Sequence, residues 1–171
     1  MQKEFSLPLK VADLPQSEQR YKMVANADNL IFVAQVLQVP QVKFLQADFV
    51  IKNNHKTSIL NVTGHIKTEI TMQSVISLEN FDVKYDFDFS TIFDTKATLD
   101  SQKNEGIDWD ENAPDIVING QIDLGDIAIE QIALKIEEYP RIKGEQFNFK
   151  ADFDPKEKIN NPFAILSRLK K

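Results

Sequence analysis

The chain has 171 residues and no cysteine, which excludes disulfides, thiolate metal ligands and a cysteine nucleophile. Its 42% hydrophobic and 27% charged residues are ordinary for a globular domain, and no apolar run has the length of a signal peptide or of a membrane-spanning helix. We therefore expect one cytoplasmic domain over residues 1–171, with no membrane contact.

The net charge of −6 is distributed unevenly along the chain. Residues 79–130 contain 3 basic and 14 acidic side chains, whereas residues 140–171 contain 8 basic and 4 acidic ones. Because neutralisation of phosphates dominates affinity for nucleic acid, the acidic middle is unfavourable for binding free nucleic acid, and no DNA partner is expected. The basic end is the part of the chain that could contact RNA locally.

Segments of extended character dominate the first half of the chain. Alternation is clearest over residues 58–72, where Leu60 and Ile66 share one side of the strand and His65 lies on the other. The links between the later segments are too short for crossover helices, so we expect an antiparallel sheet. Strands are predicted at residues 4–11, 20–25, 41–52, 58–72 and 83–89.

Two helices are predicted before the C-terminal segment of the chain. Asp28 is expected to cap a short helix over residues 30–37, which Pro40 ends. The stronger prediction is a helix within residues 121–141 that ends near Glu138, because Pro140 cannot continue the hydrogen-bond ladder.

Four residues of this second helix receive individual predictions. Asp123 suits the N-cap, because its carboxylate can accept hydrogen bonds from free backbone N–H groups. Leu124 and Leu134 are expected in the core. Glu130 is polar beside an apolar stripe, so the fold does not obviously require it.

The remaining segments complete the expected fold. Residues 94–115 are polar and acidic without periodicity and are expected to form a flexible loop. Residues 115–121 and 147–153 have short strand patterns, and Asn161 with Pro162 suits the start of a C-terminal helix. The expected fold class is α+β, with a mostly antiparallel, curved or barrel-like sheet and two or three packed helices.

The sequence has none of the common catalytic motifs, and we expect neither an enzyme nor a cofactor. His55 and His65 are expected to have surface or structural roles, because a metal site needs further ligands beside them. Asp108, Asp110 and Asn112 have the spacing of a calcium loop, but Ala113 stands where that loop needs glycine, so no metal site is predicted.

Three blocks of sequence resemble the YceD family of large ribosomal RNA subunit accumulation proteins. They are Ile122-Asp123-Leu124 with Glu130 and Ala133-Leu134, the ending Asn161-Pro162-Phe163-Ala164-Ile165-Leu166 with Leu169-Lys170, and the strand from Val62 to Met72 that runs on to Phe81. Many family members carry a C-x-x-C pair after this strand, where the present chain has Ser74 and Ser77. Hydroxyls are poor zinc ligands, so metal or redox chemistry is not expected there.

The resemblance implies a bacterial ribosome-biogenesis factor made of a single YceD-like domain that supports accumulation of large-subunit ribosomal RNA. The implied partners are that RNA or a pre-ribosomal particle, together with a ribosomal or assembly protein. Basic residues near the end of the chain are the predicted contacts: Arg141, Lys143, Arg168, Lys170 and Lys171.

Two other function classes stay open at this point. Long alternating strands and twelve phenylalanines could enclose an apolar cavity, as in a lipid- or small-molecule-binding module. Carboxylates of the acidic loop, such as Asp108 and Asp110, could serve a hydrolase or nuclease with Mg²⁺.

Overall fold

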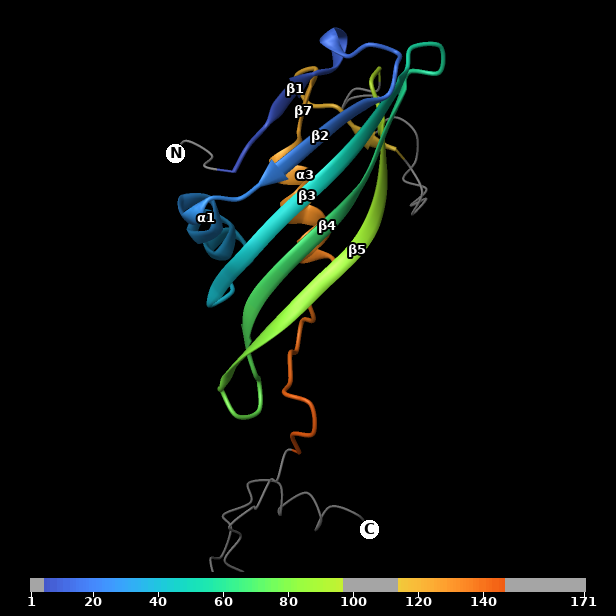
Figure 1. Ribbon diagram of the computed structural model, residues 1–171. Helices are drawn as coiled ribbons and strands as arrows, with labels where there is room; N and C mark the ends of the chain where they lie inside the picture. Colours follow the sequence, from blue (N-terminus) through green and yellow to red (C-terminus); the bar gives the residue numbers. More distant parts are fainter. Residues whose placement is uncertain (1–4, 97–113, 147–171) are drawn as a thin grey trace, which may run out of the picture.

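A five-stranded sheet in the order β2-β3-β4-β5-β6 forms the centre of the computed structural model, which describes residues 5–96 and 114–146 (Figure 1). The first four strands pair antiparallel, and β6 lies parallel to the end of β5. Their bounds are β2 (Gln19–Val24), β3 (Gln41–Asn54), β4 (Ile59–Gln73), β5 (Asn80–Asp94) and β6 (Asp115–Ile116).

The predicted alternation of β4 is confirmed. Leu60, Val62 and Ile66 are fully buried on one face, while His65 and Lys67 lie on the face turned to solvent. Because side chains in a strand alternate between the two faces, this pattern fixes which face of the sheet receives the helices. The long hairpins β3–β4 and β4–β5 therefore present one apolar and one polar surface along their whole length.

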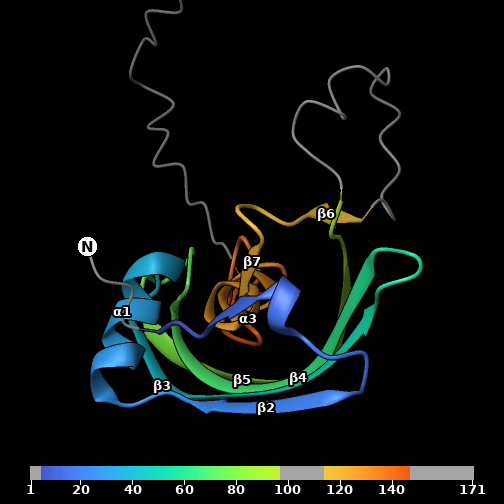
Figure 2. The same ribbon diagram turned by 90° about the horizontal axis from the view of Figure 1, so that it is seen from above.

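Two helices and a small second sheet cover the apolar face (Figure 2). Helix α3 lies on the concave side of the bent sheet, beneath the two-stranded ribbon, and α1 lies beside them. All of these elements share one hydrophobic core. The covering elements are β1 (Pro8–Lys10), the short 3₁₀ turn η1 (Val11–Asp13), α1 (Ala27–Leu37), β7 (Gln121–Asp123) and α3 (Leu124–Ala133).

The predicted α+β class and the mostly antiparallel sheet are confirmed, but the barrel-like sheet is wrong. Strands β2 and β6 end the sheet on its two sides and do not pair with each other. A barrel closes only if its first and last strands meet, and β6 is two residues long. The concave side is filled instead by α3 and the β1–β7 ribbon (Figure 2).

Helix α1 begins earlier than predicted and has a different cap. Asn26, not Asp28, is the N-cap: its side chain accepts from the Asn29 backbone N–H, and the Asn29 side chain accepts from that of Asn26. This reciprocal pair satisfies two of the free N–H groups at the helix start. The helix ends at Leu37, and its C-cap Gln38 adopts the left-handed conformation before Pro40.

Helix α3 is shorter than the predicted helix at both ends. Residues Gln121–Asp123 form β7, which pairs with β1, and Asp123 is the N-cap as predicted. The helix ends at Ala133, not near Glu138, and Leu134, which was expected in the core, is 72% exposed. A final turn follows, in which the Leu134 N–H donates to the Glu130 carbonyl at 3.0 Å and the Ile136 N–H donates to the Ile132 carbonyl at 3.1 Å. Around this turn Lys135 and Glu137 contact side chains of β5, so tertiary contacts compete with a longer helix.

Other predicted boundaries are corrected or lie outside the described residues. The first strand was predicted over residues 4–11 but is only β1 (Pro8–Lys10), because its partner β7 offers only three residues. The acidic loop starts after β5, which reaches Asp94, and its residues 97–113 are not described. The strand at 147–153 and the helix from Asn161 also lie outside the described part.

Candidate functional site

The Asp123 carboxylate joins the start of α3 to the N-terminal segment. Its Oδ1 atom accepts hydrogen bonds from the backbone N–H groups of Gly125 at 2.8 Å and Leu7 at 3.0 Å, and its Oδ2 atom accepts from the Ser6 hydroxyl at 2.5 Å. The Leu124 N–H donates in turn to the Leu7 carbonyl at 3.1 Å. Asp123 therefore acts as a helix cap and as the anchor of β1 together.

The electrostatics of Asp123 follow from the same contacts. Partial burial by itself raises the pKa of the carboxyl, but the hydrogen bonds from Ser6, Leu7, Gly125 and the Asp126 backbone outweigh it, so the pKa of Asp123 is lowered. The ionised form is thus the one that the fold stabilises. Sequence reasoning found the cap, but Ser6 and Leu7 are more than a hundred residues away along the chain and gave no signal.

The solvent side of α3 carries Glu130, Ala133 and Leu134, all of which are exposed. Desolvation raises the pKa of Glu130, and the carboxylates of Asp115 and Asp126 raise it further. The described surroundings therefore disfavour the ionised form of Glu130 relative to that of a free glutamate. That the fold does not require Glu130 stays a prediction.

The chain after α3 crosses the inner face of β5 toward the β4–β5 hairpin. Lys135 Nζ lies 5.4 Å from the centre of the Phe87 ring, a cation–π contact. Glu137 follows Lys135 by two residues and acts on Tyr85 of the same strand: burial and the Glu137 carboxylate raise the pKa of Tyr85. The Val75 N–H then donates to the Pro140 carbonyl at 3.0 Å, which fixes the segment to the hairpin.

Ser74, Ser77 and Glu145 close this arrangement, and we call these three residues the clasp. The Ser74 hydroxyl donates to Glu145 Oε2 at 2.5 Å, and the Ser77 hydroxyl donates to Glu145 Oε1. The buried Ser74 oxygen also accepts from the Ile76 N–H at 3.1 Å, and Glu145 Oε2 accepts from the Ile142 N–H at 3.1 Å. The two serines therefore bind a carboxylate of the chain itself, a partner that could not be found from sequence because it lies about seventy residues away.

We expect the clasp to open in acid. Hydrogen bonds from Ser74 and then Ser77 lower the pKa of Glu145, with further help from the Ile142 N–H and the Arg141 charge. A lowered pKa means that the stabilisation is present above the ordinary glutamate pKa of 4.5 and is lost as the pH falls through the lowered value. NMR titration should show the amide signals of Val75 and Ile142 moving together in that window.

The matched variant for this titration is Glu145→Gln, which keeps the shape of the side chain but cannot ionise. Its Val75 and Ile142 signals should stay constant over the same pH range. If the two amides titrate equally in the variant, the clasp is not the group that responds to acid.

Of the predicted contact residues, the structure describes Arg141 and Lys143. Both are exposed on the segment that the clasp holds, between Pro140 and Glu145. The other three, Arg168, Lys170 and Lys171, lie outside the described residues, as do the family-motif residues Asn161, Pro162 and Phe163.

The outer face of the sheet is polar and pairs its own charges. His65 on β4 places Nε2 at 2.7 Å from Asp86 and Nδ1 at 2.6 Å from Asp88, both on the neighbouring strand. The expected surface role of His65 is thus a cross-strand contact. His55 lies at the β3–β4 turn, where its ring contacts Asn53 and the Leu14 carbonyl, a structural role.

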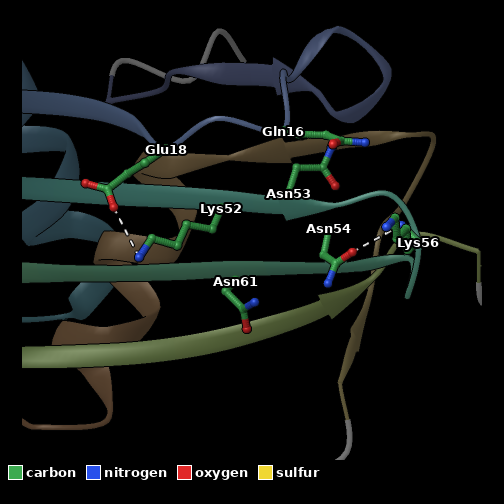
Figure 3. Close-up of a pocket in the computed structure, with 7 residues that line it drawn as sticks. All are labelled: Gln16, Glu18, Lys52, Asn53, Asn54, Lys56 and Asn61. Atoms are coloured by element: carbon green, nitrogen blue, oxygen red, sulfur yellow. Dashed lines mark hydrogen bonds and ion pairs between the residues drawn. The ribbon is translucent and has the colours of Figure 1, made fainter.

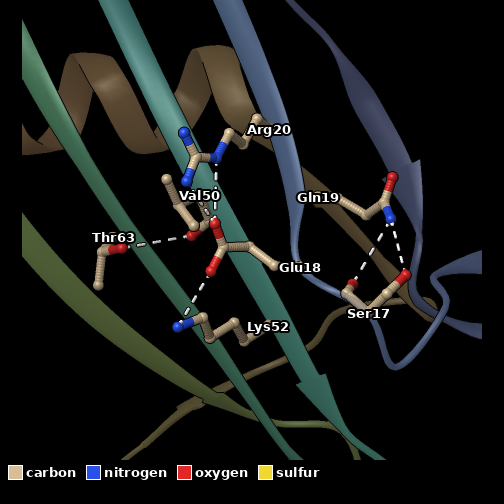
Figure 4. Close-up of polar contacts among 7 residues, drawn as sticks. All are labelled: Ser17, Glu18, Gln19, Arg20, Val50, Lys52 and Thr63. Carbon is tan, nitrogen blue, oxygen red and sulfur yellow. Dashed lines mark hydrogen bonds and ion pairs between the residues drawn. The ribbon is translucent and has the colours of Figure 1, made fainter.

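The β2–β3 side of the same face shows the same balance (Figure 4). Glu18 bridges Arg20 at 2.8 Å and Lys52 at 3.1 Å, and the Thr63 hydroxyl donates to the Val50 carbonyl at 3.4 Å. Because cations here face carboxylates, this surface offers phosphate little net attraction.

Two surface depressions bear on the alternative of a lipid-binding module. One, between α1 and the start of β3, has apolar walls that include Ile31, Val39 and Val42. Both depressions are open to solvent, and neither provides the enclosed apolar cavity that this alternative requires. The other is polar and lies by the β3–β4 hairpin (Figure 3), lined by Gln16, Glu18, Lys52, Asn53, Asn54, Lys56 and Asn61.

Among residues 5–96 and 114–146, no three histidine or acidic side chains are arranged to hold a metal ion. Asp108, Asp110 and Asn112, the calcium-like motif, lie outside these ranges, as does most of the acidic loop on which the hydrolase alternative depends. No helix of the described chain is long and apolar enough to cross a membrane.

Comparison with known proteins assigns the chain to a family. The family described as large ribosomal RNA subunit accumulation protein YceD matches residues 62–170. This range begins in β4 and contains β5, α3, the clasp and the predicted motif residues Asp123, Leu124 and Glu130. No curated protein and no solved structure matches the chain. A match over well more than half of the sequence, ending in the basic C-terminal residues, shows that this chain belongs to the YceD family.

Proposed function

We propose that this protein supports the accumulation of large-subunit ribosomal RNA as a non-enzymatic ribosome-biogenesis factor in the bacterial cytoplasm. It does so by binding that RNA, or an assembly intermediate that contains it, and it needs no cofactor. The observation that carries this proposal is the family match over residues 62–170. The same range holds every residue predicted to contact RNA except Lys171, which follows it directly.

The distribution of charge supports one end of the chain as the contact region. The outer face of the sheet pairs its charges, and the solvent side of α3 is acidic around Glu130. Residues 140–171 carry a net charge of +4, from 8 basic and 4 acidic side chains. Arg141 and Lys143 are held beside the hairpin by the clasp, so they would meet a phosphate backbone at a fixed position.

Replacing Arg141 and Lys143 by glutamine should weaken binding to a large-subunit RNA fragment. Each lost phosphate contact lowers the slope of log K against log salt by about one unit, so we expect the slope to fall by about two. Fluorescence anisotropy between about 50 and 200 mM salt measures it. The matched control replaces Lys67 and Lys84 on the outer face, where affinity should stay unchanged; equal losses in both variants would contradict the assigned contacts.

Depletion of the protein from its cell tests the function itself. Mature or precursor large-subunit RNA should decrease relative to small-subunit RNA, and re-expression of the intact chain should restore the ratio. Unchanged ribosome profiles after depletion would rule out the proposed role, whatever the binding experiment shows.

A further inference from the structure

The exposed side of α3 includes apolar residues, whose exposure to water does not stabilise the fold. Glu130 and Ala133 lie on the last turn of α3 and Leu134 is its C-cap, and we call these three residues the α3 stripe. Leu134 is 72% exposed, and the exposed carboxylate of Glu130 lies four residues before it, one helical turn away. An apolar side chain next to a carboxylate fits a partner that is both apolar and basic.

The C-terminal residues of the same chain have this chemistry. Residues 161–171 read NPFAILSRLKK, with four large apolar side chains in Phe163, Ile165, Leu166 and Leu169 and three basic ones in Arg168, Lys170 and Lys171. The charge of this segment is opposite to that of residues 79–130, which carry 3 basic and 14 acidic side chains. The chain therefore contains both the α3 stripe and a segment whose apolar and basic side chains complement it.

The length of the chain permits the contact. The last described residue, Gln146, lies close to the clasp, because its neighbour Glu145 belongs to it. An extended chain spans about 3.3–3.6 Å per residue, so the stretch from Gln146 to Asn161 reaches about 50 Å. Gln146 itself can lie at most about 45 Å from the end of α3, because only residues 134–146 separate them. The stretch from Gln146 to Asn161 is therefore long enough to bring residue 161 back to α3.

We propose that residues 161–171 dock on the α3 stripe, where their apolar side chains cover Ala133 and Leu134 and their basic end pairs with the Glu130 carboxylate. The groove between α1 and β3 is the competing surface. Its walls are apolar, but its charged lining residue, Lys43, is paired with Asp82 at 2.5 Å, and the lining contains no carboxylate that would attract a basic segment. Of these two surfaces, only the α3 stripe offers an exposed carboxylate, that of Glu130.

A paramagnetic label on the C-terminal segment tests the docking in the full-length protein. The chain has no cysteine, so Ser167→Cys gives a single labelling site. We expect the label to broaden the NMR amide signals of Glu130, Ala133 and Leu134, and the broadening to decrease between about 50 and 500 mM salt as the charges are screened. Broadening at Ile31 and Val39, or at no described residue, would overturn the proposal.

A pair of matched variants separates the charge contact from general effects. Glu130→Gln in the labelled protein should reduce the broadening by about half or more, because it removes the carboxylate that attracts the segment. Glu69→Gln, the same substitution on the outer face of the sheet, should leave it unchanged. Both variants are judged only after their amide spectra show the dispersion of the folded protein, so that unfolding is not mistaken for undocking.

A consequence for RNA rests on the proposed function. Arg168, Lys170 and Lys171 cannot pair with α3 and with phosphate together, so RNA and the α3 stripe compete for them. Glu130→Gln should therefore tighten binding of the large-subunit RNA fragment, and an unchanged affinity would contradict the competition. If no variant binds RNA, the proposed function loses its support, while the label experiment still decides whether the segment docks.

Discussion

Replacing Asp123 by alanine is expected to destabilise the protein by about 2–4 kcal/mol. Loss of an N-cap costs about 1 kcal/mol, and the Leu7 N–H, which donates to Asp123 Oδ1, loses its acceptor in a partly buried place. Helix α3 and β1 should loosen together, because one carboxylate holds both. Urea unfolding of the full chain measures the change, and a loss below about 1 kcal/mol would show that other contacts anchor β1.

The variant Asp123→Asn separates the charge from the cap. Its amide oxygen can still accept from the Gly125 and Leu7 N–H groups, so we expect a smaller loss of about 1 kcal/mol at neutral pH. The lowered pKa of Asp123 means that its ionised form contributes stability above the ordinary value of 3.8, and this contribution is lost as the pH falls through the lowered value. The difference between the wild type and Asp123→Asn should therefore shrink in acid.

The second large effect is expected at Gly64, where β4 passes closest to its neighbours. A Cβ atom there would lie 2.4 Å from the Asp48 carbonyl oxygen and 2.6 Å from the Phe89 ring. That ring is held edge-on against Phe49, with 5.7 Å between the ring centres, so it cannot withdraw without disturbing the core. Gly64→Ala should cost about 3 kcal/mol or more, because a backbone atom and an aromatic ring must both move.

The control for Gly64 is its neighbour Thr63, on the solvent-exposed face of the same strand. Thr63→Ala removes an exposed side chain and a long hydrogen bond of 3.4 Å to the Val50 carbonyl, so the change should stay within about 0.5 kcal/mol. Thermal unfolding of the two variants should separate them by several degrees. Similar midpoints would mean that the sheet can widen at Gly64 and that the close approach is not a constraint.

The family match also bears on how the candidate site should be studied. Residues 62–170 include the clasp and α3, whereas β1, β2, α1 and most of β3 precede the match. Variants at Ser74, Glu130, Arg141 and Glu145 therefore test parts of the chain that the family match covers. Variants in the groove between α1 and β3 test a part of the chain that lies before the family match.

Local periodicity was sufficient to predict β3 and β4, whereas β5 (Asn80–Asp94) extends beyond the predicted residues 83–89 at both ends. In β4 the two-residue alternation of Leu60, Val62 and Ile66 against His65 and Lys67 predicted both the strand and its buried face. Such a pattern is a property of neighbouring residues, and a shift of one residue would expose the whole apolar set. The Asp123 cap was predicted for the same reason, since a cap depends on the few residues that follow it.

What the sequence by itself determined is therefore the strand pattern, the polar outer face, the cap at Asp123, the charge separation along the chain and the resemblance to the YceD family. Only the tertiary structure decided that the sheet stays open, that α3 ends at Ala133 with Leu134 exposed, and that Ser74 and Ser77 bind Glu145. These last features depend on contacts between residues from about seventy to more than a hundred positions apart. The free energy of such contacts comes from packing and hydrogen bonds between whole elements, which no local pattern of residue types records.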